Sequence, residues 1–208
     1  MSLFLGLETK KILIFGISNR KSIAYSIAKI LQNENSTIIC SVQNETQKEF
    51  VIKNLPNVSV YICDVTDDKQ MAELSHQIKS EYGTIHGIVH SVAFANLAEG
   101  IKPFHETKRD DFFKALDVSC FSFIRVANLF KNILDLDGAM VTISISTTRM
   151  AAESYGYMAP IKAALDSSVV FLAKSLSQDT RIRVNAVGAS LLKTSSSAGI
   201  PGYLEPYM

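Results

Sequence analysis

The sequence predicts an α/β protein with one doubly wound parallel sheet and helices on both faces, arranged in three α/β/α layers. Short apolar runs alternate with longer amphipathic segments, and most of the short runs are rich in valine and isoleucine, as buried strands are. No repeat or linker-like break interrupts residues 1–208, so we expect a single domain with one sizeable core. The expected strands are Lys11–Phe15, Thr37–Val42, Val58–Cys63, Gly87–Ser91, Ala139–Ser144 and Arg183–Val187.

Helices are expected between these strands. In Ser22–Asn33 the residues Ile23, Ile27 and Leu31 share one face, and Ser22 is available to cap the first turn. In an open parallel sheet the ligand binds outside the carboxyl ends of the strands, so we expect the functional residues there. The other expected helices are Thr46–Leu55, Lys69–Tyr82, Lys108–Leu134 and Met158–Gln178.

The composition excludes several classes of partner. A formal net charge of +1 provides no long-range field that favours nucleic acid or an anionic membrane. No apolar run reaches membrane-spanning length, and no signal peptide is recognisable. Cys40, Cys63 and Cys120 lack the spacing of metal ligands, which favours free thiols in a reducing cytosol over a disulfide or a metal site. We therefore expect a soluble cytoplasmic protein without a metal.

The turn after the first strand is the first candidate for chemistry. Gly16 follows Phe15 directly, and a helix is expected to begin at Ser22. A helix N-terminus offers unpaired N–H donors and partial positive charge, which suit a pyrophosphate, and a glycine permits close approach. Only the first glycine of a GxGxxG motif is present, so this segment alone leaves a phosphate-binding loop and an ordinary tight turn equally open.

The spacing from Gly16 to Ser22-Ile23-Ala24 is more specific than the glycine alone. It resembles, without a gap, the cofactor loop of divergent short-chain dehydrogenase/reductases of the enoyl-[acyl-carrier-protein] reductase group. The resemblance extends from about Leu7 to Ile200. It implies a Rossmann-type fold, a nicotinamide cofactor, and contacts of Ser22 and Ile23 with the cofactor diphosphate.

The end of the second strand bears on the choice of cofactor. Gln43 stands where an Asp or Glu often holds the adenosine ribose, as is common in the enoyl reductase group. No Arg or Lys follows directly to bind a 2′-phosphate, so NADH is favoured over NADPH. Arg20 or Lys21 could supply that charge from the first loop, which leaves NADPH open.

Two further strand ends continue the resemblance. Asp64 and Val65 are expected to hold the adenine, although Asp64 could instead cap the helix that starts near Asp67. The run from His90 to Ala95 resembles the family's His-Ser-Ile-Gly-Phe-Ala, with an alanine at position 93 in place of the glycine. It implies cofactor contacts at Ser91-Val92 and a substrate contact at Ala95, whereas we expect the buried His90 to be structural.

Tyr155 and Lys162 are the most discriminating pair in the chain. Ordinary short-chain dehydrogenases place Tyr four residues before Lys, where this chain has Met158. The enoyl reductase group uses a spacing of seven, about two helical turns, which Tyr155 and Lys162 meet. Helical geometry would turn Tyr157 about 200° away from Tyr155, so we do not expect Tyr157 to act at the site.

The resemblance implies a chemical role for each member of the pair. Reduction of a trans-2-enoyl thioester develops enolate charge on the thioester oxygen, and the Tyr155 hydroxyl would stabilise that charge as it forms. Lys162 would bind the nicotinamide ribose and place positive charge beside the tyrosine. The plain alternative is an ordinary loop aromatic and a surface lysine.

The last part of the chain departs from the family. Ile145 replaces a second tyrosine, and Ser190-Leu191 replaces Gly-Pro in a turn. Leu192 and Thr194 match positions that hold the nicotinamide carboxamide. Residues 195–208 resemble the family's mobile substrate-binding lid, which implies substrate contacts at Ala198 and Ile200.

Family members continue into a last helix and a seventh strand beyond this point. A sheet without that strand exposes an unpaired edge, so we expect a partner to cover it, and the family forms tetramers. The main hypothesis is therefore an NADH-dependent enoyl-[acyl-carrier-protein] reductase of type II fatty-acid synthesis, acting on a carrier-bound enoyl thioester. The alternatives are a short-chain reductase of another small apolar substrate and a non-catalytic dinucleotide-binding paralogue.

Overall fold

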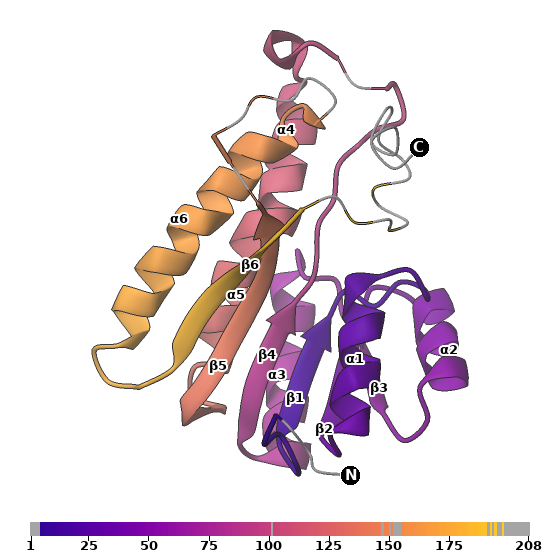
Figure 1. Ribbon diagram of the computed structural model, residues 1–208, viewed down its shortest axis with the longest axis vertical. Coiled ribbons are helices and arrows are strands. Elements are labelled where there is room, and N and C mark those ends of the chain that lie inside the picture. Colours follow the sequence, from indigo (N-terminus) through magenta and orange to yellow (C-terminus); the bar gives the residue numbers. More distant parts are fainter. Residues whose placement is uncertain are drawn as a thin grey trace.

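The sheet has six parallel strands in the order β3-β2-β1-β4-β5-β6 (Figure 1). A computed structural model describes residues 5–100, 102–146, 148–149, 151, 155–190, 192, 194 and 197. This strand order belongs to a Rossmann-type sheet, in which the direction of winding reverses between β1 and β4. The fold class expected from the sequence is confirmed. The strands are β1 (Lys11–Phe15), β2 (Thr37–Val42), β3 (Ser59–Ile62), β4 (Ile85–His90), β5 (Leu134–Ile145) and β6 (Arg183–Ala189).

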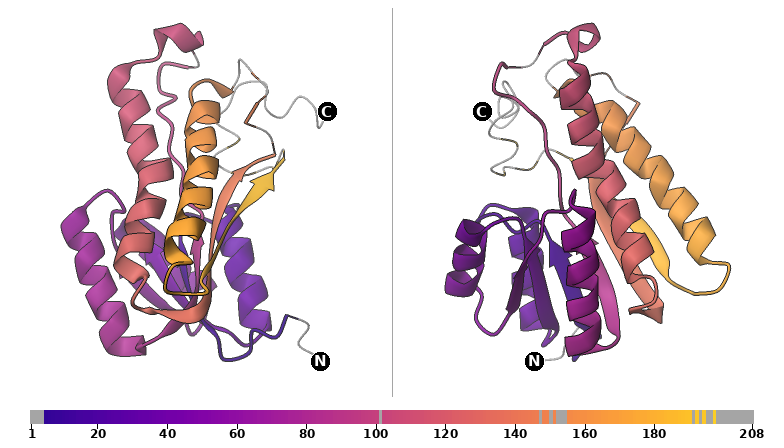
Figure 2. Two further views of the ribbon diagram at one scale, coloured as in Figure 1. Left: turned by 90° about the vertical axis from the view of Figure 1, so that its left-hand side faces the viewer. Right: turned by 180° about the vertical axis from the view of Figure 1, so that it is seen from behind.

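Helices cover both faces of the sheet (Figure 2). Two hydrophobic clusters, one on each side, form the core. One cluster packs under α1 (Ile23–Asn33) and α2 (Glu45–Asn54). The other, larger cluster packs under the helices of the opposite face. These are α3 (Asp68–Tyr82), α4 (Arg109–Leu116), the π-helical turn η2 (Asp117–Phe121), α5 (Ser122–Phe130) and α6 (Met158–Leu176), with the short 3-10 helix η1 (Phe104–Glu106) preceding α4.

The first helix, α1, has the buried apolar face and the N-cap that its sequence predicts. Ala24, Ala28 and Leu31 lie on its buried face, as the spacing of apolar residues predicts. Ser22 is the N-cap, and its hydroxyl accepts a hydrogen bond from the Tyr25 amide at 3.3 Å. Loss of such a cap costs about 1 kcal/mol, so one side chain both starts the helix and fixes the end of the preceding loop.

The long helix expected over Lys108–Leu134 is wrong in two respects. A π-helical turn, η2, separates α4 from α5, and the helix ends at Phe130. β5 then begins at Leu134 and pairs with Ile85 before the register shifts, so that Gly87 pairs with Ala139. The periodic apolar residues after Phe130 are buried by the sheet rather than by a helix, because Leu134 takes part in this irregular first pairing.

The three cysteines are free and buried in the core. Burial raises the pKa of the Cys40 and Cys63 thiols to about 12, so both stay protonated at neutral pH. No helix within the described part of the chain is long and apolar enough to cross a membrane.

Candidate active site at the carboxyl ends of the strands

The turn at Gly16 is built against the end of β4. Gly16 has a φ of +98°, and a Cβ there would lie 2.1 Å from the Ser91 carbonyl oxygen. The Ser91 amide donates to the Phe15 carbonyl at 3.1 Å, which holds the two strand ends together. Glycine is therefore required at position 16, because Ser91 and Val92 pack over this turn. The two segments predicted to bind the cofactor, at Gly16 and at Ser91-Val92, are in direct contact.

The first turn of α1 suits an anionic group. The hydroxyl of Ser22 donates to the Asn19 carbonyl at 2.8 Å and accepts from Tyr25, so the cap is fixed from both sides. Among the described residues, none accepts a hydrogen bond from the Ile23 or Ala24 amide. These amides and the partial positive charge of the helix end fit the diphosphate of a dinucleotide.

Gln43 and Asp64 meet across the ends of β2 and β3. The Gln43 side-chain amide donates to Asp64 at 3.4 Å, and the amide and hydroxyl of Thr66 donate to the same carboxylate at 2.9 and 2.7 Å. Burial opposes ionisation of Asp64, but these hydrogen bonds outweigh it and hold the pKa of the carboxyl below its ordinary value. The helix-cap alternative for Asp64 is wrong, because Asp67 caps α3 by accepting from Lys69 and Gln70. Asp64 therefore presents a carboxylate at the predicted adenine position.

Arg20 is bonded to the last residue of α2. Its guanidinium donates twice to the side-chain oxygen of Asn54, at 3.1 and 2.7 Å, at the end of α2. Lys21 is exposed in the same loop. This arrangement favours NADH, because the arginine that could pair with a 2′-phosphate already has a partner.

His90 is fully buried and serves the fold. Its Nε2 lies 2.7 Å from the Ser122 hydroxyl, which itself donates to the Val118 carbonyl at 2.7 Å. Its Nδ1 lies 3.1 Å from the Thr142 hydroxyl, which donates to the His90 carbonyl at 3.1 Å. Burial lowers the pKa of His90 to about 3, so the ring is neutral and ties β4 and β5 to the helix that follows η2.

Lys162 is buried on α6, and the plain alternative of a surface lysine is wrong. Only 5% of the residue is exposed, and its ammonium donates to the Ile143 carbonyl of β5 at 2.6 Å. Burial lowers the pKa of Lys162 to about 8, with Asp166 and Cys120 opposing the shift. The lysine is thus held at the end of β5 in a form that is still mostly charged at neutral pH.

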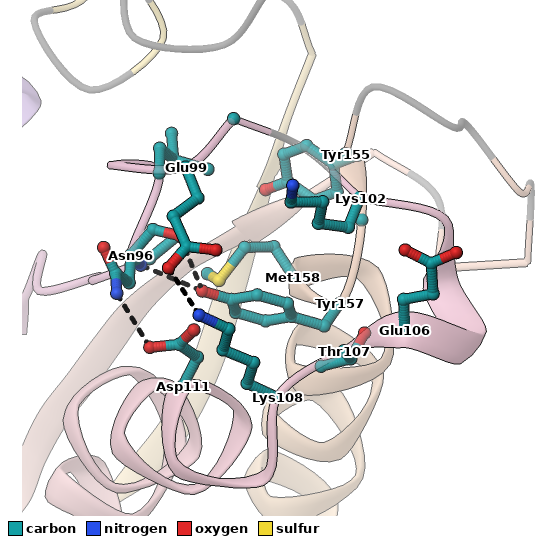
Figure 3. A pocket seen from close by; sticks show the side chains of 14 residues that line it. Asn96, Glu99, Lys102, Glu106, Thr107, Lys108, Asp111, Tyr155, Tyr157 and Met158 are labelled. Atoms are coloured by element: carbon teal, nitrogen blue, oxygen red, sulfur yellow. Dashed lines mark hydrogen bonds and ion pairs between the residues drawn. The ribbon is translucent and has the colours of Figure 1, made fainter.

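Tyr155 and Ala95, both predicted to touch substrate, line one small pocket. Figure 3 shows Tyr155 among the residues that line it. The pocket lies between the loop that follows β4 and the start of α6. Tyr155 also packs against the core cluster beneath the sheet, which limits the freedom of its ring. The structure therefore brings together a phenol and a loop backbone from residues 60 positions apart in the sequence.

The expected orientation of Tyr157 is wrong. α6 begins only at Met158, and Gly156 has a φ of +52°, so residues 155–157 do not follow helical geometry. Tyr157 lines the same pocket as Tyr155, and its hydroxyl contacts Asn96 in the loop after β4 (Figure 3). The seven-residue spacing from Tyr155 to Lys162 therefore spans one non-helical turn and one helical turn, instead of two helical turns.

The segment beyond β6 is described only in part. Leu192 is 44% exposed, and the Thr194 amide donates to the Ser197 hydroxyl at 2.8 Å. Ala198 and Ile200, the predicted lid contacts, lie outside the described residues, as does Leu191. Ile145, which replaces the family's second tyrosine, is the last residue of β5 and is half-buried.

Three residues that support the site escaped the sequence analysis. Ser119 in η2 and Asn96 in the loop after β4 organise the pocket, and Arg125 donates to the Val65 carbonyl at 2.7 Å. No motif marks these residues, because each acts through a partner that is distant in sequence. Gly156 could have predicted the position of Tyr157, because a glycine just before a helix indicates that helical geometry does not extend through it.

Comparisons with known proteins agree with this geometry. A family model described as "Enoyl-(Acyl carrier protein) reductase" matches residues 16–207. The chain belongs to the enoyl-(acyl carrier protein) reductase family. Enoyl-[acyl-carrier-protein] reductase [NADH] FabI of Enterococcus faecalis is 34% identical over 198 residues, which are 95% of this chain and 79% of that protein.

Other members of the enoyl reductase family differ in their named cofactor. Enoyl-[acyl-carrier-protein] reductase [NADPH] FabI of Staphylococcus aureus (strain NCTC 8325) is 34% identical over 204 residues, covering 96% of this chain and 79% of that protein. The Bacillus cereus enoyl-acyl carrier protein reductase, solved with NADP+ and indole naphthyridinone, superposes with a TM-score of 0.89 at 33% identity. The match covers 96% of this chain and 79% of that one. The family predicted from the sequence is therefore confirmed. The prediction that the chain is a nicotinamide-dependent oxidoreductase is confirmed with it.

Proposed function

We propose that this chain reduces the trans-2 double bond of an enoyl thioester carried on acyl-carrier protein, with NADH, in type II fatty-acid synthesis. The observation that carries the proposal is the pocket that Tyr155 shares with Ala95, between the loop that follows β4 and the start of α6. The family names of its relatives and the buried Lys162 support the same chemistry.

The cofactor fits the residues at the strand ends. The cradle at Gly16 leaves no room for a side chain, and the α1 amides fit a diphosphate. When bound, the nicotinamide supplies a hydride to the β-carbon of the thioester. The residues that we propose to hold it are Gly16, Ser22, Ile23, Gln43, Asp64, Val65, Ser91, Val92, Lys162, Leu192 and Thr194.

Tyr155 and Lys162 carry the chemistry in this proposal. The Tyr155 hydroxyl donates to the thioester oxygen as enolate charge develops, which stabilises the transition state more than the ground state. Lys162 exchanges its bond to the Ile143 carbonyl for the ribose hydroxyls and keeps a positive charge close to that oxygen. Burial lowers its pKa to about 8, so this charge is lost in mildly alkaline solution.

We further propose a cytoplasmic homo-oligomer, a tetramer by resemblance to the family. The outer surface of the α4–α6 layer exposes large apolar side chains. Exposed apolar patches of this kind mark sites where another protein chain packs. These side chains are Phe113, Phe121, Val170 and Phe171, between 48% and 74% exposed. Free, buried cysteines are compatible with a reducing compartment.

The test is consumption of NADH by the purified chain with crotonyl thioester on acyl-carrier protein. We expect turnover with wild type and its loss in Tyr155→Phe and Lys162→Met, with fluorescence showing that NADH still binds. Binding of NADH without turnover on any enoyl thioester would leave the dinucleotide-binding paralogue as the remaining function. A matched panel of enones and ketones separates enoyl reduction from reduction of another small apolar substrate, the alternative that Ile145 motivates.

A further inference from the structure

Two hydroxyl groups hold the loop after β4, one on each side of Ala95. The Phe94 amide donates to the Ser119 hydroxyl at 2.9 Å, and that hydroxyl donates to the Phe94 carbonyl at 3.3 Å. The Asn96 amide donates to the Tyr157 hydroxyl at 2.9 Å, and that hydroxyl donates to the Asn96 carbonyl at 3.3 Å. Each hydroxyl thus binds both backbone polar groups of one residue, and Ala95 lies between the two bound residues.

Both hydroxyls come from rigid surroundings. Ser119 is fully buried in the π-helical turn η2. The ring of Tyr157 packs edge-on against Phe112, with ring centroids 6.4 Å apart, and against the core cluster. Residues 91–97 form neither helix nor strand, so these two side chains, together with the packing of Ala95 on the core cluster, set the shape of the loop at Ala95.

The side chain of Asn96 completes the arrangement (Figure 3). Its amide group donates to Asp111 of α4 at 2.8 Å, and its oxygen accepts from the Ala98 amide at 3.2 Å. Lys108 pairs with Glu99 across the same stretch of loop. These bonds order the outer part of the loop, whereas the Tyr157 hydroxyl is the group that ties its backbone to the start of α6.

We propose that Tyr157 is a positioning residue that, together with Ser119, fixes the Ala95 backbone and so sets the binding of the acyl substrate. This inference rests on the proposed enoyl reduction. Ala95 and Tyr155 line the same pocket, so the position of Ala95 determines how closely an acyl thioester fits beside the catalytic phenol. Tyr157 itself takes no part in the proton or hydride transfer.

The physical argument predicts an effect on binding more than on turnover. Without the Tyr157 hydroxyl, the exposed Asn96 amide and carbonyl bond to water instead, so the loop loosens without unfolding the core. Tyr155, Lys162 and the cofactor cradle keep their own supports. Looser binding in the ground and transition states alike raises KM and leaves kcat nearly unchanged.

The experiment compares wild type with Tyr157→Phe, which keeps the ring and removes only the hydroxyl, and with Ser119→Ala. Steady-state kinetics with crotonyl thioester, NADH binding by fluorescence and amide hydrogen exchange of the segment around Ala95 are measured on the full chain. Tyr61→Phe is the matched control, because Tyr61 lies on β3 and its hydroxyl donates to Glu81 of α3, away from the pocket at Ala95.

For Tyr157→Phe we expect KM for the thioester to rise about three- to tenfold, the equivalent of one or two hydrogen bonds, with kcat changed less than about twofold. NADH affinity stays at the wild-type value, and exchange around Ala95 accelerates. The Tyr61 variant changes none of these. An unchanged KM, or a fall in kcat alone, overturns the role of Tyr157 while enoyl reduction stands. If the wild-type chain turns over no enoyl thioester, that result overturns the proposed function, and the inference about Tyr157 falls with it.

Discussion

The cofactor side and the substrate side of this site are built in different ways. At the ends of β1 to β4, the predicted residues lie at regular strand ends and helix caps. Several of their contacts are local, such as Ser22 with Tyr25 and Asp64 with Thr66, although Gly16 packs against the distant Ser91. On the substrate side, the pocket is made by an irregular loop and a non-helical turn. Its defining contacts, such as Tyr157 with Asn96, join residues 61 positions apart.

This difference explains which parts of the site can tolerate change. A cofactor loop that must hold a diphosphate is fixed by backbone geometry, and Gly16 shows how little room remains. A substrate pocket that is shaped by side-chain hydroxyls can be altered by a single substitution without disturbing the sheet. Of the departures from the family, Ile145 replaces a tyrosine on the substrate side, whereas the alanine at position 93 follows the predicted cofactor contacts Ser91 and Val92.

The largest expected effect tests the chemistry of the substrate side. Tyr155→Phe removes the hydroxyl proposed to stabilise the enolate, and we expect kcat to fall about a hundred- to a thousandfold. NADH affinity, measured by fluorescence titration, should equal that of wild type because the cofactor side is untouched. Activity within a few-fold of wild type would assign the proton donor to another group.

The next test strikes the cofactor side. Gly16→Ala places a Cβ against the Ser91 carbonyl in a left-handed conformation, and we expect a loss of about 3–4 kcal/mol in unfolding free energy together with much weaker NADH binding. Gly83→Ala is the control, since Gly83 has a φ of +65° but no atom within 4 Å of the added group. Equal losses in both variants, measured by urea unfolding, would show that backbone conformation alone matters at Gly16.

Lys162 is proposed to act on both sides, because it binds the cofactor ribose and places positive charge near the substrate oxygen. The titration of its ammonium group gives a third test. Its pKa is lowered from 10.5 to about 8, so between these pH values the unfolded chain binds more protons than the folded chain. Stability should therefore increase as pH rises through this window, by about 3 kcal/mol from this group, while activity declines above about pH 8. In Lys162→Met that contribution to the pH dependence of urea unfolding disappears. An identical slope in wild type and variant would contradict the burial of this charge.

The smallest expected effect is at the far end of the cofactor side. Asp64→Asn removes a carboxylate that accepts from Gln43 and Thr66, and we expect NADH to bind about three- to fivefold more weakly. Crotonyl-thioester KM at saturating NADH should not change, because the pocket at Ala95 is on the other side. A shift in that KM would show that the two sides are coupled.

Much of the cofactor side could be predicted from the sequence because its signals are local. β1 and β2 begin and end where the apolar runs predict, and α1 begins at its cap. The substrate side could not be predicted to the same degree. A helical period extrapolated through Tyr155 and Tyr157 gave the wrong direction for Tyr157, because Gly156 breaks that geometry before α6 begins.

The sequence by itself determined the fold class, the family, and the residues most suited to cofactor and catalysis, since periodicity, caps and motif spacing act within a few residues. The tertiary structure alone decided that Gly16 packs against Ser91, that Lys162 is buried on the Ile143 carbonyl, and that Tyr157 and Ser119 hold the loop at Ala95. These contacts join segments distant along the chain. Their partners are chosen by how β4, η2 and α6 pack together, which no local pattern encodes.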